Sequence, residues 1–299
     1  MKTESPLPRF TALVLLASAA GYAQQPPSAV FRPAMLDLSA ASYSYSTQAD
    51  LRASNTTVGA VAVHHAEMSI SGRHDFTPGL MLAYGLAYDA NILAASAATP
   101  LPHQLAAFSL NLGVIHPGDA KWTTSLFVRP GFYGDFETLG RSSFNVPLLV
   151  SASYTPRREL AWTFAVSYTA FSDYEVLPVV GLRWQLARDW NLQLGFPHTG
   201  LTWQVGQKLA LHAAAEFQGG SYRITHVLPG AAVPTLGGSL LDYREIRTGV
   251  GFEYQLRKMS TVSAAAGLVI DRRFDFYERS YRLDGNTAGY LKLAFNSSF

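Results

Sequence analysis

The sequence predicts an all-β fold: a single-chain, antiparallel, up-and-down transmembrane β-barrel of about fourteen strands. Three observations lead to this prediction: large apolar residues alternate with small or polar ones, aromatic residues stand near both ends of the apolar faces, and tight connections alternate with longer ones. The chain has 299 residues with 24 glycines, an aromatic share of 12% and a charged share of 15%. Such a composition suits strands and turns better than helices.

The alternation is clearest in segment 160–169, and segments 80–88, 108–114, 144–154 and 246–256 repeat it. Successive side chains of a strand point to opposite sides, so each segment has one apolar face and one small or polar face. A soluble sandwich produces the same alternation, which therefore does not distinguish a sandwich from a barrel. The large residues of the clearest segment are Leu160, Trp162, Phe164, Val166 and Tyr168.

The placing of aromatic residues favours a membrane barrel over a sandwich. Trp122 is paired with Phe132, and Phe144 with Tyr154, at a spacing of ten residues. On a strand tilted by about 40°, ten residues climb roughly 25 Å, which is the height of the lipid-facing band of such barrels. Aromatic rings favour the two water–lipid interfaces. A helical membrane protein is not expected, because no apolar stretch of about 18 residues occurs after the first two dozen.

Alternating connection lengths complete the argument. The tight connections include 156–158, 188–189 and 257–259, whereas 91–103 and 272–287 are examples of the longer ones. Short periplasmic turns alternating with longer outer loops are typical of outer-membrane barrels, and they place both termini in the periplasm with an even strand number. The expected strands are 35–47, 57–70, 79–90, 104–115, 121–133, 143–155, 159–170, 176–187, 190–197, 200–206, 208–228, 242–256, 260–271 and 288–299.

Two places leave the strand number open. The two strands within 190–206 are shorter than the roughly nine to eleven residues that a span needs. They form either two spans or a hairpin resting on the rim, which would leave twelve strands; fourteen is narrowly preferred. The pair Gly219-Gly220 is either a bulge inside one strand or a turn between two.

The N-terminal segment has the features of an export signal. Residues 1–23 combine a weakly basic start, an apolar core too short to span a bilayer, and small residues before Gln24. We therefore expect a signal peptide at 1–23, a flexible mature N-terminus at 24–34 and a barrel over 35–299. The expected location is the bacterial outer membrane, with its lipid as a partner.

The C-terminal segment resembles the signal that the outer-membrane assembly machinery recognises. It ends in an alternating strand with a terminal phenylalanine, and Ser297 is a polar departure from the apolar positions. The resemblance implies that this machinery is a partner during biogenesis. The residues that match the signal are Gly289, Tyr290, Leu293, Phe295 and Phe299.

Three glycine-rich segments carry a resemblance to a family. They are Pro130-Gly-Phe-Tyr-Gly-Asp-Phe136, Trp190-Asn-Leu-Gln-Leu-Gly-Phe-Pro197 and Gly-Gly-Ser-Tyr222. On these segments the mature chain resembles an uncharacterised outer-membrane β-barrel family known only as a domain of unknown function. The resemblance implies a location and a fold, and it implies no activity.

Few motifs indicate chemistry. There is no cysteine, no serine nucleophile elbow, no phosphate-binding loop and no zinc-binding helix. His64 and His65 are adjacent, so on a strand they point to opposite faces and cannot chelate one metal ion. With 23 basic and 21 acidic residues and no basic block, nucleic acid is not expected as a partner. No catalytic residue, metal site or cofactor is predicted.

A set of charged residues is expected to face the lumen or its mouth. His212 and Glu216 share a face and are interpreted as lumen packing rather than as a proton-transfer pair. Asp135 and Glu137 either constrict the mouth or lie in a solvated loop, and the loop is preferred. The full set is Arg129, Asp135, Glu137, Arg183, His212, Glu216, Glu245, Arg247 and Glu253.

Three functions remain open, and a passive channel or small-solute transporter ranks first. Its support is that inward faces rich in Ala, Ser, Thr and Gly leave space inside a barrel of twelve to fourteen strands. A structural or binding barrel that acts through its outer loops ranks second. A lipid-modifying enzyme ranks last, because the sequence lacks a nucleophile signature, and we predict that the protein is not an enzyme. The sequence does not determine the oligomeric state.

Overall fold

The computed structural model describes residues 38–77, 79–97, 99–119, 121–226, 228 and 236–298. The expected signal peptide, the expected flexible segment 24–34 and Phe299 lie outside these residues. Within them, no helix has the length and apolarity that a helical membrane span requires. Two short 3-10 turns, η2 (Arg141–Ser143) and η3 (Tyr277–Arg279), accompany the strands.

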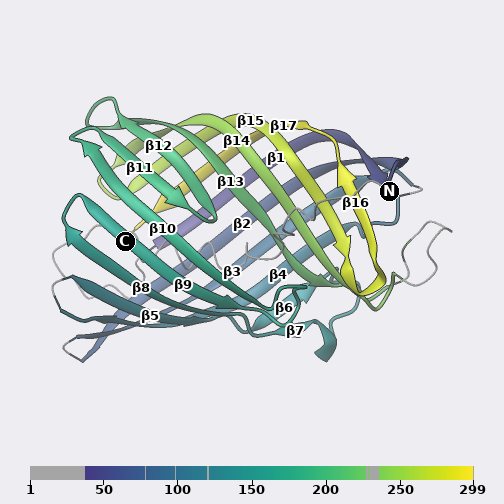
Figure 1. Ribbon diagram of the computed structural model, residues 1–299, viewed down its shortest axis with the longest axis horizontal. Helices are drawn as coiled ribbons and strands as arrows, with labels where there is room; N and C mark the ends of the chain where they lie inside the picture. Colours follow the sequence, from purple (N-terminus) through teal and green to yellow (C-terminus); the bar gives the residue numbers. More distant parts are fainter. Residues whose placement is uncertain are drawn as a thin grey trace, which may run out of the picture.

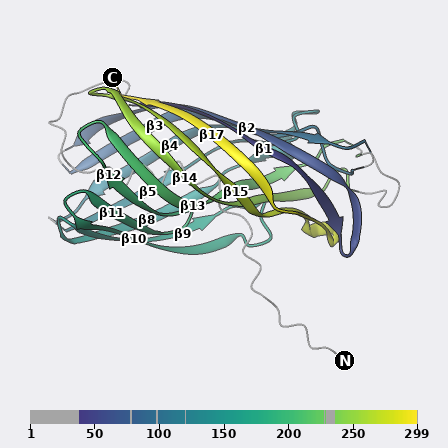
Figure 2. The same ribbon diagram turned by 90° about the horizontal axis from the view of Figure 1, so that it is seen from above.

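Seventeen strands form one sheet that closes on itself (Figures 1 and 2). Consecutive spans along the chain pair in antiparallel fashion, and β1 pairs with both β2 and β17. The strands are β1 (Leu38–Ala53), β2 (Thr56–Thr77), β3 (Leu80–Ala95), β4 (Gln104–Pro117), β5 (Trp122–Val128), β6 (Gly131–Gly134), β7 (Phe144–Asn145), β8 (Leu148–Arg157), β9 (Leu160–Tyr168), β10 (Val176–Ala187), β11 (Trp190–Gly195), β12 (His198–Gln204), β13 (Leu209–Arg223), β14 (Leu240–Arg257), β15 (Ser260–Phe276), β16 (Tyr281–Gly285) and β17 (Ala288–Ser297).

The seventeen strands make fourteen spans of the barrel wall. β5 and β6 pair in succession with β4, so they are one interrupted span, and β7 with β8 forms the next. β16 and β17 likewise pair in succession with β15 and with β1. The predicted all-β barrel with fourteen strands is confirmed, and the alternative of twelve is wrong. Gly219 and Gly220 lie inside the continuous strand β13, which excludes a turn there.

The two ends of the barrel differ in their connections. We call the end where β2, β4, β8, β10, β12 and β14 turn into the next strand the turn end, and the opposite end the loop end. β1 begins and β17 finishes at the turn end, where Ser39 is the register partner of Ser297. At the loop end, 96–103, 135–143 and 224–239 connect strands. The expectation that 272–287 is a loop is wrong, because β15 continues to Phe276 and pairs with β16.

The outer face carries exposed apolar residues along nearly every strand. A Trp- and Tyr-rich band lies near the turn end, where Trp122 packs on Tyr154 at a ring distance of 4.7 Å and Trp190 stacks on Trp203 at 5.5 Å. Closer to the loop end, aromatic rings occur again on the same face, for example at Phe132. This arrangement is typical of the lipid-facing surface of a membrane barrel.

The ladder of paired strands is interrupted beside the hairpin β11–β12, which reaches only part of the way along the barrel (Figure 1). β10 pairs with β11 only from Gly181 onward, and β13 pairs with β12 only as far as Glu216. Toward the loop end, Val176–Val180 of β10 and Phe217–Tyr222 of β13 therefore have a partner strand on one side only. We call the interval between these two segments the wall gap.

Pro178 lies on the open edge of β10. Gln185 donates its backbone N–H to Glu159 O on the β9 side, at 2.8 Å. Backbone N–H groups alternate in direction along a strand, so the nitrogen of Pro178, an odd number of positions away, faces the wall gap. Proline has no N–H, and it is therefore tolerated at an unpaired sheet edge. Across the gap, Phe217 N–H is satisfied by the hairpin tip through Pro197 O, at 2.8 Å.

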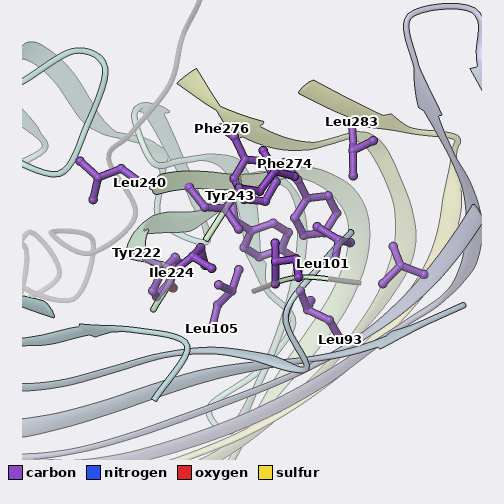
Figure 3. Packing of buried hydrophobic residues seen from close by; sticks show 14 of the residues in the cluster. Leu93, Leu101, Leu105, Tyr222, Ile224, Leu240, Tyr243, Phe274, Phe276 and Leu283 are labelled. Atoms are coloured by element: carbon purple, nitrogen blue, oxygen red, sulfur yellow. The ribbon is translucent and has the colours of Figure 1, made fainter. Parts of the chain in front are cut away.

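The core is an apolar cluster inside the barrel at its loop end (Figure 3). Its side chains come from opposite walls and from the connections above them, and each is at most 8% exposed. We call this cluster the plug. Its members include Leu51, Val63, Leu93, Leu105, Tyr133, Tyr222, Ile224, Leu241, Tyr243, Phe274, Phe276 and Leu283.

Gly219 gives a test of this packing. Its φ of +145° is rarely adopted by residues with a side chain, and an added Cβ would collide with the backbone oxygen of Tyr243. We expect Gly219→Ala to destabilise the barrel by about 1–3 kcal/mol, measured by urea unfolding in detergent. The control is Gly206→Ala in the β12–β13 turn, where a Cβ meets no atom within 4 Å. Equal stability of the two variants would contradict the strain at Gly219.

Candidate functional site: the lumen

The inward-facing residues change from apolar to polar at one level of the barrel. On β2 the plug residue Val63 is followed toward the turn end by His65, and on β14 Tyr243 is followed by Glu245. The same change occurs on β15, where Phe274 is followed by Arg272. A belt of polar and charged side chains therefore lies directly beneath the plug, and we call it the charged belt.

An ion-pair network forms one side of this belt. Glu245 contacts Arg247 on its own strand at 2.6 Å and Arg272 on β15 at 2.6 Å, and all three side chains are fully buried. Arg247 also donates to Ser44 Oγ at 2.7 Å, and Arg272 donates to Val61 O at 3.0 Å. Buried charges persist only when they are paired and hydrogen-bonded, as here.

A second network joins β13 to β3 across the lumen. Asn91 donates to Tyr222 Oη at 3.2 Å, and Tyr222 donates to Asp89 Oδ1 at 3.3 Å. His65 Nδ1 lies 3.1 Å from Asn91 Oδ1, whereas His64 is bonded to Tyr43 on the outer face at 2.7 Å. The prediction that the two histidines point to opposite faces is confirmed.

Toward the turn end the lumen wall becomes small and polar. Gly249, Gly251, Ala265 and Gly267 line the inner face of β14 and β15. Because these residues carry little or no side chain, groups on flanking strands reach across them. The bridging groups are Tyr290 over Gly249, His212 over Gly251, and Lys292 of β17 bonded to Glu216 of β13 at 2.8 Å.

The opposite wall of the turn-end lumen is apolar. Ile115, Phe127 and Leu149 form a small buried cluster with Met81, Ala83 and Ala165 packed against it. The Phe127 ring covers Gly113 of β4, where an added Cβ would collide with it. The turn-end lumen is therefore two-sided, with small and charged groups on β13–β17 and apolar groups on β3–β9.

The structure places the predicted site residues in different surroundings. His212 and Glu216 share the inner face, yet no hydrogen bond or ion pair within the described residues joins them; Glu216 contacts Lys292 and His198 instead. Arg183 and Glu253 stand at inward positions next to the outward-facing Trp184 and Phe252, and Glu253 is exposed. Arg129 is buried at the charged belt, where Arg129 Nη2 lies 3.5 Å from Ser109 Oγ.

The preference for a solvated loop at 135–137 is wrong for Asp135 and holds for Glu137, which is exposed. Asp135 is buried and accepts hydrogen bonds from the backbone and hydroxyl of Thr225, at 2.7 and 2.6 Å. His226 Nδ1 lies 2.8 Å from Asp135 Oδ2. Together with the bridge between Gly134 and Arg223, these contacts tie β6 to β13 across the loop end.

The contacts of Asp135 lower its pKa. Burial alone would raise the pKa of the carboxyl, but hydrogen bonds from Thr225 and His226 outweigh burial and hold the pKa below its ordinary value of 3.8. The carboxylate therefore stabilises the contact between β6 and β13 whenever it is ionised.

Several residues of the lumen were missed by the sequence interpretation. Arg272 was assigned to an outer loop, and Asp89, His198 and Lys292 were not singled out. A signal for Asp89 and Lys292 was present, since each stands at an inward position of an alternating strand. Their partners lie on strands far away in sequence, which local alternation does not reveal.

The ion-pair network predicts a large effect of one substitution. Glu245→Ala leaves Arg247 and Arg272 buried without a carboxylate, so we expect a loss of about 3–5 kcal/mol in the free energy of unfolding. Urea titration in detergent measures it, with Glu253→Ala on the same strand and face as the control. If Glu245→Ala lowers the free energy of unfolding no more than Glu253→Ala does, the network does not hold the two arginines.

The lowered pKa of Asp135 predicts a pH dependence. The stability that the carboxylate contributes is fully present above pH 3.8 and is lost as the pH falls through the lower folded pKa. We expect Asp135→Asn to cost about 1.5–3 kcal/mol at pH 7, as lost bonds to a charged group. The difference from the wild type should shrink only below pH 3.8. Glu137→Gln is the exposed control, and a difference that already declines at pH 5 would contradict the lowered pKa.

The fold is similar to those of solved membrane channels. The toluene transporter TodX of Pseudomonas putida aligns with a TM-score of 0.51 at 9% identity, covering 88% of this chain and 90% of that one. A TodX mutant described as a monoaromatic hydrocarbon channel aligns at 0.55 and 11%, covering 94% of each chain. An outer-membrane channel from Pseudomonas putida F1 aligns at 0.50 and 11%, covering 92% and 99%.

At identities this low, the structural likenesses show the shared fold alone. A search of curated protein sequences finds no significant match. One family model does match, over residues 78–296, which is most of the barrel. The chain therefore belongs to the family described as a domain of unknown function, DUF6268.

Proposed function

We propose that this protein is a passive channel for small solutes in the bacterial outer membrane. The observation that carries the proposal is the position of the wall gap, which lies beside a turn-end lumen lined by small residues. The solved channels with the same fold support the location. In this membrane the turn end faces the periplasm, as short turns do in such barrels.

A straight path along the barrel axis is blocked at the loop end. The plug fills the interior there, and the Asp135 contacts join β6 to β13 above the charged belt. A solute that occupies the turn-end lumen therefore leaves or enters through the wall. The wall gap is the interval where the ladder of the described strands is interrupted.

The lining of this route favours small solutes that are largely apolar. One wall of the turn-end lumen is the apolar cluster around Phe127, and the plug above it is apolar as well. The charged groups of the belt are mostly paired with one another, which leaves little net charge to attract ions. The solved neighbours described as monoaromatic hydrocarbon channels carry solutes of this kind.

Export and assembly follow the sequence signals under this proposal. A signal peptide at 1–23 directs export, and the assembly machinery recognises the C-terminal strand. Leu293 and Phe295 of that strand are exposed on the outer face, whereas Tyr290 faces the lumen. The exposed pair supports the recognition, because a partner reaches those side chains before lipid covers them.

The lumen route predicts opposite behaviour of two adjacent alanines on β15. Ala265 faces the lumen and Ala266 faces outward. We expect Ala265→Trp to reduce the entry of toluene into proteoliposomes by about tenfold, since one indole fills the space that one small aromatic solute needs. Ala266→Trp should leave entry unchanged. Equal fluxes for the two variants, or no protein-dependent flux of any solute, would contradict the channel.

The wall gap provides a second matched pair. Val179 points inward behind the unpaired edge of β10, and Val180 points outward. If solutes pass through the gap, Val179→Trp lowers toluene flux as Ala265→Trp does, and Val180→Trp lowers it less. If Ala265→Trp reduces the toluene flux and Val179→Trp does not, the exit lies elsewhere in the wall.

A further inference from the structure

Nine buried side-chain atoms of the described residues have no hydrogen-bond partner, and three of them belong to inward-facing residues below the plug and outside the ion-pair network of Glu245. These three are Asn111 Oδ1, Arg129 Nε and Gln218 Nε2. The Asn111 residue is 9% exposed and Arg129 is 4% exposed. Folding that leaves such an atom unpaired costs free energy, so most buried polar atoms have a partner. Unpaired atoms on inward-facing residues indicate a site that something else completes.

The register places Asn111 beside Arg129, and a single bridge relates their wall to the strand that carries Gln218. Asn111 of β4 lies opposite Arg129, because the flanking register pairs are Leu112 with Val128 and Ser109 with Gly131. β6 and β13 run parallel and meet where Gly134 bridges Arg223. Arg129 lies five residues before Gly134, and Gln218 lies five residues before Arg223, in each case toward the turn end.

Gln218 also lies on the segment of β13 that borders the wall gap. Gln218 therefore stands at the inner side of the gap, and Asn111 and Arg129 lie on the wall formed by β4 and β5, between the plug above and the turn-end lumen below. The Phe127 ring occupies the next inward position of β5 below Arg129, so an apolar surface adjoins them. A solute that uses the wall gap passes this group of atoms.

The chemistry of the group selects a hydroxyl. Arg129 Nε and Gln218 Nε2 donate hydrogen bonds, and Asn111 Oδ1 accepts one. A hydroxyl both accepts and donates, whereas a hydrocarbon does neither and a carboxylate cannot donate to Asn111. Arg129 also interacts electrostatically with Asp89 of β3, and this nearby acidic group disfavours a second anion.

We propose that Asn111, Arg129 and Gln218 form a binding site for the hydroxyl group of a small, otherwise apolar solute, such as an aromatic alcohol. The ring of the solute lies on the apolar surface around Phe127. This inference rests on the proposed channel function and names a preferred substrate class for it. The site distinguishes a solute that carries a hydroxyl group from a hydrocarbon, which the apolar lining alone does not do.

Binding to the purified full-length mature protein in detergent tests the site. The probes are benzyl alcohol, toluene and benzoate, which share a ring and differ in the polar group. We expect benzyl alcohol to bind about three- to tenfold more tightly than toluene, the usual range for one or two net hydrogen bonds. Asn111→Leu should abolish this ratio and leave the toluene affinity unchanged.

Thermal stability provides the second readout. Asn111→Leu removes an unpaired buried oxygen at similar volume, so the melting temperature should stay equal or rise. The matched control is Asn145→Leu, because Asn145 donates to Thr169 Oγ1 at 2.9 Å and accepts from Val146 N at 2.8 Å. That control should lower the melting temperature and keep the alcohol preference. Gln218→Leu gives an independent variant if Asn111→Leu does not fold.

The outcomes separate the two proposals. The site is overturned if benzyl alcohol still binds more tightly than toluene in both Asn111→Leu and Gln218→Leu, or if Asn111→Leu lowers the melting temperature. In either case, water alone satisfies these atoms. Tightest binding of benzoate overturns the hydroxyl assignment. If the alcohol preference depends on Asn111 but no solute crosses proteoliposomes, the site stands and the channel function fails. Toluene flux without any alcohol preference leaves the channel and removes the site.

Discussion

The rest of the structure depends on one requirement: every backbone N–H and C=O group at membrane depth needs a partner within the protein. Lipid offers none, so the ladder between β1 and β17 must close the sheet. Closure fixes which side chains face inward, because the pleat alternates around the ring except at bulges such as those in β1 and β15. The plug, the charged belt and the small-residue wall all follow from that alternation. The wall gap is the place where the requirement is relaxed, and Pro178 is found there.

The interior is organised by level as well as by face. Apolar residues gather at the loop end, where the cross-section is filled, and charges follow directly beneath. Glu245 with its two arginines shows why the belt is stable: each charge has a partner and further hydrogen bonds. Asn111, Arg129 and Gln218 are the contrasting part of the same belt, with atoms that the described protein leaves unpaired. The lumen beneath the plug therefore combines a rigid network with an unfilled set of donors and acceptors.

Much of the architecture was predictable from the sequence, because alternation, aromatic spacing and turn lengths are local signals. The strands around Trp162 and Phe252 were predicted close to their observed bounds. The contacts across the lumen were not predictable in this way. Asp135 was assigned to solvent since its partners Thr225 and His226 lie some ninety positions away. Arg272 was assigned to a loop because its charged neighbourhood resembles one, although β14 and β16 extend the ladder there.

The short β11–β12 hairpin makes the wall of this fourteen-strand barrel different at its two ends. Near the turn end, fourteen strands surround the interior, whereas above the hairpin tip only twelve remain. Backbone pairing leaves β10 and β13 unjoined at that height, and the side chains of the plug fill the interior there instead. A single sheet thus makes an open vestibule at the turn end and a solid cap at the loop end, without any inserted domain.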